Sequence, residues 1–287
     1  MAEARPNVHR RRLGSALRSL RIAAGYSMEE AAESLGLSGK PALSKIENGK
    51  QRVSGLGLTA FFQVYKVSEE AKCKIKTLAS LAASGKRTNL LDEYGDAISD
   101  EFAEFLNLES MATKAESYLN LVPGLLQTKE YARAIVESSK KWPSQREVNH
   151  FVDLRMARQV ALTREDPISL GCILDEAALR RVVGSPEIMR EQLLRLLNAT
   201  EKHPHVTIQV LPFAIGGHAG SDGSFQVLHF PAGPPVAIVE TMTTTAYLEE
   251  DRVIGRYETA LGHLRTQALD GPASRRFIHE MIKDCYS

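Results

Sequence analysis

Lysine and arginine side chains that could bind phosphate or guanine gather in the first quarter of the chain. Residues 1–66 contain eleven Lys and Arg but five Asp and Glu, a charge of +6, whereas the remainder has 25 basic and 30 acidic residues within a total charge of +1. Ammonium and guanidinium groups bind phosphate oxygens and the acceptor atoms of guanine. The uneven charge predicts an N-terminal part that binds nucleic acid and a remainder that does not bind it alone.

A second set of candidate residues lies in the C-terminal half. Arg155, Arg158 and Gln159 fall on one side of a predicted helix. They could bind an anionic ligand, line an interface or form a solvated surface. The glycine-rich loop over residues 216–224 carries His218 and Asp222, which could close over a small ligand or a partner.

The sequence contains no coherent catalytic or metal-binding set. The 216–224 loop brings His, Asp and Ser together, but members of a catalytic triad are rarely neighbours in sequence, and no Gly-x-Ser-x-Gly elbow occurs. Cys73, Cys172 and Cys285 are scattered without metal spacing. We expect no enzyme activity, no metal and no cofactor.

The same features predict the compartment. The three cysteines are odd in number and scattered along the sequence, which is typical of reduced thiols. No apolar run approaches the roughly 18 residues of a membrane span. The start of the chain is polar and basic, without the apolar core of a signal peptide. We expect a cytoplasmic protein that does not associate with a membrane.

The basic residues are positioned by two short predicted helices between Ser27 and Arg52. Ser27 and Glu30 form the sequence pattern of a capping box, which starts the first helix. Gly36 suits the left-handed turn that ends this helix. Pro41 fits the first turn of the second helix, which Asn48 and Gly49 end. Helices this short need neighbours to be stable.

This stretch resembles the helix-turn-helix of lambda-repressor-like, XRE-like regulators. The most specific part is Leu43-Ser44-Lys45-Ile46-Glu47-Asn48-Gly49, and the resemblance runs from about Arg10 to Val67. It implies that the helix near residues 40–48 enters the major groove of DNA. The sequence departs from the class at Met28, where a phosphate-binding Gln is usual, and in a turn that is one residue longer.

The resemblance also implies roles for single residues. Arg21 and Glu47 match a structural salt bridge of the class. Lys50 and Arg52 lie in a loop similar to its phosphate-contacting loops. Arg10, Arg11 and Arg12 could reach a phosphate or the minor groove, or form a solvated basic terminus. The residues expected to contact DNA are Arg10, Arg11, Arg12, Ser27, Lys40, Pro41, Ala42, Ser44, Lys45, Asn48, Lys50 and Arg52.

The pattern along the chain predicts two domains. A loose arm over residues 1–9 precedes five helices, and we place the first domain at residues 1–85. Residues 86–287 begin with helices and continue with β-branched, strand-length runs near residues 168–174, 206–211, 224–230 and 235–240. We expect a mainly α protein whose second domain is α+β, with a small, mainly antiparallel sheet flanked by helices.

A second resemblance covers nearly the whole chain. The runs over residues 122–128, 155–159, 174–181 and 208–213 are similar to those of an actinobacterial group called WhiJ-like or antitoxin-like regulators. Its members join an XRE-like helix-turn-helix to a C-terminal domain of uncharacterised function. The resemblance implies that such proteins bind a small protein encoded beside them.

Together these features predict a transcription regulator that binds an inverted-repeat operator in double-stranded DNA as a homodimer. The C-terminal domain would dimerise, bind a small neighbour-encoded protein or sense a small-molecule effector. The alternative is an antitoxin-like interaction protein that binds such a partner and regulates only its own promoter.

Overall fold

The structure is a computed structural model that describes residues 8–84, 89–94, 98–139 and 144–286. The chain forms two compact units: Met1–Arg87 with Phe230–Pro235, here called the helical unit, and Thr88–His229 with Val236–Ser287, the sheet unit. Residues 1–7 of the predicted arm and the boundary predicted at residue 85 lie outside the described residues. The last two residues of that arm, Val8 and His9, are instead buried at the start of the first helix, which corrects the prediction.

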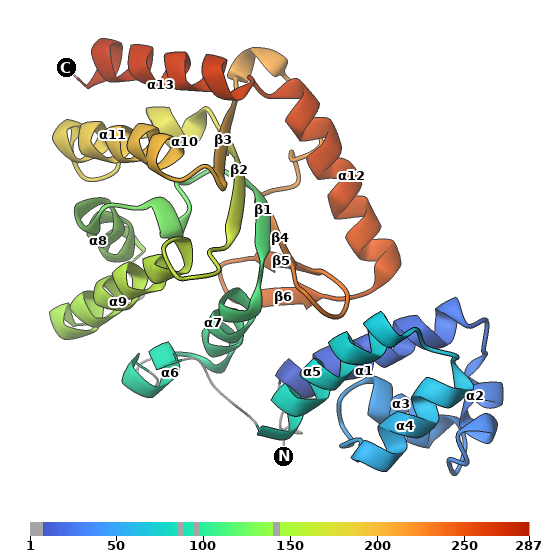
Figure 1. Cartoon of the computed structure of the whole chain (residues 1–287). Helices are drawn as coiled ribbons and strands as arrows, with labels where there is room; N and C mark the ends of the chain where they lie inside the picture. Colours follow the sequence, from blue (N-terminus) through green and yellow to red (C-terminus); the bar gives the residue numbers. More distant parts are fainter. Residues whose placement is uncertain (1–7, 85–88, 95–97, 140–143, 287) are drawn as a thin grey trace. The chain divides into compact units, whose positions relative to one another are not determined.

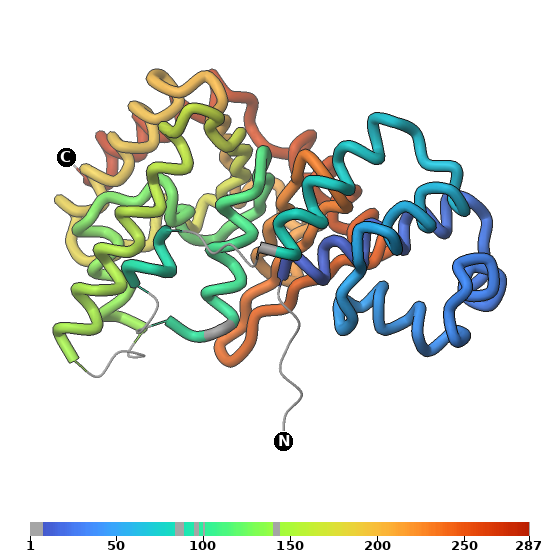
Figure 2. Tube along the Cα trace, turned by 60° about the horizontal axis from the view of Figure 1, so that its bottom comes forward, coloured from blue at the N-terminus to red at the C-terminus, as the bar shows by residue number. Residues whose placement is uncertain are grey.

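Five helices make up the described N-terminal part of the helical unit, as the sequence predicted. Helix α1 lies alongside α5 (Figures 1 and 2) and also packs on α3. The helices are α1 (Val8–Ala23), α2 (Met28–Ser34), α3 (Lys40–Glu47), α4 (Gly55–Val64) and α5 (Glu69–Ser84).

Local signals in the sequence account for the ends of α2 and α3. The Ser27 hydroxyl accepts a hydrogen bond from the Glu30 amide, and the Glu30 carboxylate accepts one from the Ser27 amide, so the predicted capping box is present. Gly36 has a φ of 66° in the turn after α2, a conformation that favours glycine. Pro41 stands in the first turn of α3.

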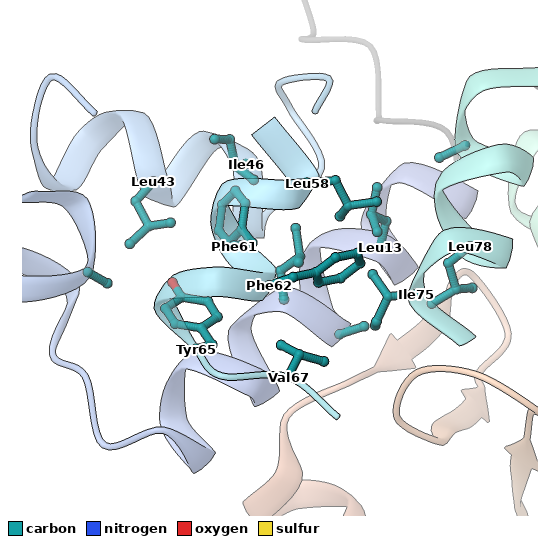
Figure 3. Packing of buried hydrophobic residues seen from close by; sticks show 14 of the residues in the cluster. Leu13, Leu43, Ile46, Leu58, Phe61, Phe62, Tyr65, Val67, Ile75 and Leu78 are labelled. Carbon is teal, nitrogen blue, oxygen red and sulfur yellow. The ribbon is translucent and has the colours of Figure 1, made fainter. Parts of the chain in front are cut away.

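The core of the helical unit is built from aliphatic residues of α1 and α3 and aromatic residues of α4 (Figure 3). Leu17 and Leu43 are fully buried. Burying a side chain of this size contributes about 1.5–3 kcal/mol, which short helices cannot gain in isolation. Ala232, far along the sequence, also belongs to this core.

Two glycines allow α1 to approach the end of α3 closely. A Cβ atom on Gly14 would lie 2.4 Å from the Glu47 carbonyl oxygen. Gly49 has a φ of 68°, and a Cβ atom there would lie 2.7 Å from the Arg11 amide nitrogen. Backbone therefore packs on backbone at both positions, and α1 forms the seat of α3.

The sheet unit contains a six-stranded mixed sheet with strand order β3-β2-β1-β4-β5-β6. The β1–β2 and β2–β3 pairs are parallel, and the other three pairs are antiparallel. The parallel pairs arise because helices lie between these strands in the sequence. The strands are β1 (Lys114–Leu119), β2 (Ser169–Asp175), β3 (Val206–Leu211), β4 (Phe225–His229), β5 (Val236–Glu240) and β6 (Thr245–Leu248).

Helices cover both faces of this sheet, which confirms the predicted α+β class. The helices between β1 and β3 lie on one face and α12 on the other (Figure 1), where Leu261 and Leu264 pack on Tyr118 and Val227. The α-helices are α6 (Asn89–Tyr94), α7 (Asp100–Met111), α8 (Lys129–Ser138), α9 (Gln145–Ala157), α10 (Ala177–Arg180), α11 (Pro186–Lys202), α12 (Asp251–Gln267) and α13 (Gly271–Cys285). The short 3-10 turns are η2 (Gly124–Leu126), η3 (Arg158–Leu162) and η4 (Phe213–Ile215).

No helix within the described ranges combines the length and the apolar character that crossing a membrane requires.

Candidate nucleic-acid interface

Helix α3 has one buried face and one face open to solvent. Leu43 and Ile46 are buried beneath it. Lys40, Pro41 and Lys45 are exposed, and Ala42 and Ser44 are half-buried. The two lysines therefore present their ammonium groups to solvent, as a helix that reads DNA requires.

Ser44 and Asn48 are hydrogen-bonded to each other at the end of α3. The Asn48 side-chain amide donates to the Ser44 carbonyl oxygen at 2.8 Å and to its hydroxyl oxygen at 3.2 Å. The Ser44 carbonyl oxygen also accepts a hydrogen bond from the Asn48 backbone amide at 3.0 Å, so the Asn48 side chain adds a second donor to it. Both hydrogen bonds use the side-chain nitrogen of Asn48 as donor, so its side-chain oxygen can accept a hydrogen bond from DNA without breaking them.

Two further candidates already have partners on α2. The Lys40 ammonium lies 3.1 Å from the Glu29 carboxylate, and this hydrogen bond holds the pKa of Glu29 below its ordinary value. Both side chains are exposed, so a phosphate can replace Glu29 as the partner of Lys40 at small cost. The Ser27 hydroxyl is exposed, but it accepts the capping hydrogen bond from the Glu30 amide.

The remaining basic candidates flank α3. Lys50 and Arg52 are exposed in the loop after the helix, and Arg10 and Arg11 are half-buried at the start of α1. Arg10 and Arg52 line the same cavity of about 30 Å³. The fold thus brings together two arginines that are distant in sequence, in keeping with contacts to one stretch of phosphate backbone.

Arg12 does not belong to this interface, which corrects the sequence-based prediction. The side chain is buried, with 1% of the residue exposed. Its Nη2 atom donates to the carbonyl oxygens of Ala232 at 2.8 Å and Pro234 at 3.3 Å, and the guanidinium lies 3.4 Å from the ring centroid of Phe230. The helical period indicated this burial, because Arg12 lies one turn of α1 before the buried Ala16 and so on the same face.

The predicted ion pair between Arg21 and Glu47 is present. It is bidentate, with Nε–Oε1 at 2.7 Å and Nη2–Oε2 at 3.1 Å, and both side chains are buried. Hydrogen bonding to Glu47 raises the pKa of Arg21. Arg21 also donates to the Tyr26 carbonyl oxygen, so the pair joins α1, the turn before α2 and the last turn of α3.

In the sheet unit, Arg158 is committed to an internal ion pair. It binds Glu109 through two hydrogen bonds of 2.9 and 2.8 Å, and both residues are buried. Burial lowers the pKa of Arg158, but Glu109 outweighs this effect and the net change is a rise. The suggestion that Arg158 binds an external ligand is therefore wrong. Glu109 was missed because it lies in another helix, far from Arg158 in sequence.

Arg155 and Gln159 hold the turn η2 in place. Arg155 donates to the Gln127 side-chain oxygen at 2.9 Å, and the Gln159 amide donates to the Gln127 carbonyl oxygen at 2.7 Å. Arg195 in turn contacts the Gln159 side chain. Desolvation lowers the pKa of Arg155 to about 10. These contacts give Arg155 and Gln159 a structural role, whereas the sequence indicated only that they share one face of a helix.

His218 and Asp222 lie in a different part of the sheet unit. The His218 Nδ1 atom accepts a hydrogen bond from the Gly220 amide, and its ring packs edge-on against Tyr118 at 5.3 Å. Asp222 is exposed. In the described part of the chain, no hydrogen bond joins either residue to Arg155 or Gln159.

Comparison with protein families assigns both parts of the sequence. A model described as a helix-turn-helix domain matches residues 12–72, which include α2 and α3. A model described as a domain of unknown function, DUF5753, matches residues 102–280. Comparisons with curated proteins and with solved structures gave no match. Since the second match covers more than half of the chain, the protein belongs to the DUF5753 family and carries a helix-turn-helix domain at its N-terminus.

Proposed function

We propose that the protein is a transcription regulator that recognises an operator sequence by placing α3 in the major groove. The helix-turn-helix match supports DNA binding. The observation that carries the proposal is the outward face of α3, where Lys40 and Lys45 are exposed above the buried Leu43 and Ile46.

The basic side chains divide into two roles. Lys45 and Ser44 face outward from α3 and read base edges, since Lys suits the acceptors of guanine and Ser suits either a base or a phosphate. Arg10, Lys50 and Arg52 flank the helix and bind phosphates, which supplies affinity that falls with salt.

The protein binds an inverted repeat as a homodimer, and the sheet unit controls when it does so. Control acts through a small-molecule effector or a small protein encoded beside it, in line with the resemblance to WhiJ-like regulators. No catalytic step is part of this function. An antitoxin-like role remains the second candidate, supported by that resemblance and by the charge of the sequence after residue 66, which has more acidic than basic residues.

Selection of duplexes from a random pool by the full-length protein tests this function. We expect enrichment of one inverted repeat, and a tight stoichiometric complex with a neighbour-encoded protein would favour the second candidate. Recovery of unrelated sequences without a common motif would contradict operator recognition.

A further inference from the structure

A short proline-rich segment from the C-terminal half is a structural part of the helical unit. The segment Phe230–Pro235, with sequence Phe-Pro-Ala-Gly-Pro-Pro, groups with α1–α5 by its contacts. It begins directly after β4 and ends directly before β5. Its three prolines restrict the backbone, so that holding it in one conformation costs less entropy than for an ordinary loop.

Arg12 is the main anchor of this segment on α1. Its guanidinium lies over the Phe230 ring and donates to the carbonyl oxygens of Ala232 and Pro234. A cation–π contact that is shielded from water is stronger than an exposed one, and charge-assisted hydrogen bonds are stronger than neutral ones. Loss of the segment would expose these groups and the apolar surface around them.

Gly233 fits closely between α1 and α5. Its φ is 79°, and a Cβ atom there would lie 3.2 Å from Arg12 Nη2, 3.3 Å from Leu78 Cδ1 and 3.7 Å from Ala16 Cβ. Ala232 beside it is buried in the core of the helical unit. The segment therefore fills a site formed by both helices rather than resting on one side chain.

The part of α1 that binds the segment also seats the recognition helix. Gly14, two residues after Arg12, packs on the Glu47 carbonyl, and the Arg11 backbone packs on Gly49. Arg10 and Arg11, the candidate phosphate contacts, directly precede Arg12. Loosening α1 at Arg12 would disturb both the position of α3 and the basic residues beside it.

We propose that Phe230–Pro235 is a clamp on α1 whose engagement by Arg12 holds the helical unit in its DNA-binding form. This inference rests on the proposed function for its effect on DNA and adds a regulatory element to it. Because the clamp continues covalently into β4 and β5, a change in these strands reaches α1 through the chain itself. Release of the clamp lowers DNA affinity.

A cross-link tests whether the clamp sits on α1, independently of DNA. Ala16→Cys with Gly233→Cys, in a Cys73→Ser, Cys285→Ser background, places two Cβ atoms within the roughly 3.5–4.5 Å range of disulfides. We expect an intramolecular disulfide under mild oxidation. Arg18→Cys with Gly233→Cys is the control, because Arg18 lies on the exposed side of α1. Equal cross-linking of both pairs would overturn the clamp. So would the absence of any disulfide in a Gly233→Cys protein whose amide hydrogen exchange in α1 matches that of the wild type, because the strained cysteine has then not displaced the segment.

A second variant tests the effect on DNA. Arg12→Met in the full chain, assayed well below its melting temperature, should weaken DNA binding about tenfold or more. It should also speed amide hydrogen exchange in α1. Arg18→Met should do neither. Adding the Ala16–Gly233 disulfide to Arg12→Met should restore affinity, and reduction should remove it again.

Unchanged or higher DNA affinity in a folded Arg12→Met variant would refute the regulatory claim. If the wild-type protein bound no DNA, the proposed function would fail, whereas the cross-link and the hydrogen exchange would still decide whether the clamp exists.

Discussion

Glu116 is surrounded by three cationic or ionisable side chains in the sheet unit. Its carboxylate lies 2.8 Å from the Lys114 ammonium and 3.1 Å from His229 Nε2, and it also accepts a short hydrogen bond from Arg265. Contact with His229 contributes most to lowering the pKa of Glu116 to about 2, against the opposing effect of burial. The strands β1 and β4 and helix α12 are joined at this one carboxylate.

This arrangement predicts how acid affects the sheet unit. A carboxyl group whose pKa falls on folding stabilises the protein above its unfolded pKa, and this stabilisation is lost as the pH falls toward its folded pKa. Between about pH 5 and pH 2, the wild type should lose up to about 3 kcal/mol more stability than Glu116→Gln. Urea unfolding at several pH values measures the difference, and Glu258→Gln on the exposed side of α12 is the control. Equal acid sensitivity of Glu116→Gln and the wild type would contradict the prediction.

The buried Arg158–Glu109 pair gives a second expectation for single residues. Arg158→Met leaves the Glu109 carboxylate buried without its cation, which typically costs about 3–5 kcal/mol. The exposed Arg190→Met should change the free energy of unfolding by less than about 1 kcal/mol. Denaturant unfolding followed by circular dichroism compares the two variants. If the Arg158→Met and Arg190→Met variants had the same free energy of unfolding, the Arg158–Glu109 pair would contribute little to stability.

At the scale of elements, the sequence was informative where local chemistry decides the structure. The sequence predicted three such features: the capping box at Ser27, the proline in the first turn of α3 and the alternation of buried and exposed positions. The parallel pairing of β1 with β2 was not, because strand order depends on which crossover packs on which face. Strand β6 and helix α6 were not predicted, because both are too short to show a clear periodic pattern of apolar residues.

The seating of α3 on α1 is an element-scale prediction. Gly14→Ala pushes a methyl group toward the Glu47 carbonyl and should destabilise the protein by about 1–3 kcal/mol. Gly55→Ala, at the start of α4 where a Cβ atom meets nothing within 4 Å, should be neutral or slightly stabilising. Thermal unfolding of both variants checks the contrast. Equal effects would mean that α1 does not pack on α3 as closely as the structure shows.

The candidate site was predictable in part. Both the outward positions of α3 and the Arg21–Glu47 pair followed from the family resemblance. The partners of Arg12 could not be predicted, because they lie 220 and 222 positions away in the sequence. For the same reason, the sequence did not predict that Phe230–Pro235 belongs to the helical unit.

At the scale of the whole molecule, the first part of the sequence is basic and the remainder is acidic. Residues 1–66 carry +6 while the remaining residues are acidic in sum. Binding through this basic segment should therefore release counterions and weaken as salt rises.

Each phosphate contact contributes about −0.9 to the slope of log affinity against log salt. Lys50→Ala should reduce the magnitude of this slope by about one and weaken all duplexes alike. Lys76→Ala, an exposed lysine of α5 outside the proposed interface, should leave the slope unchanged. Fluorescence anisotropy over a series of salt concentrations measures it, and an equal loss in the two variants would contradict the assignment of Lys50.

The most direct test of the account compares the affinity of the full-length protein for its selected operator and for a shuffled duplex, with and without Lys45→Ala. If α3 reads bases through Lys45, the variant should lose about 1–3 kcal/mol of preference for the operator while it keeps its affinity for shuffled DNA. If Lys45→Ala weakens both duplexes equally, Lys45 is a phosphate contact. If the wild-type protein binds neither duplex in dilute buffer, the account of α3 as a recognition helix is wrong.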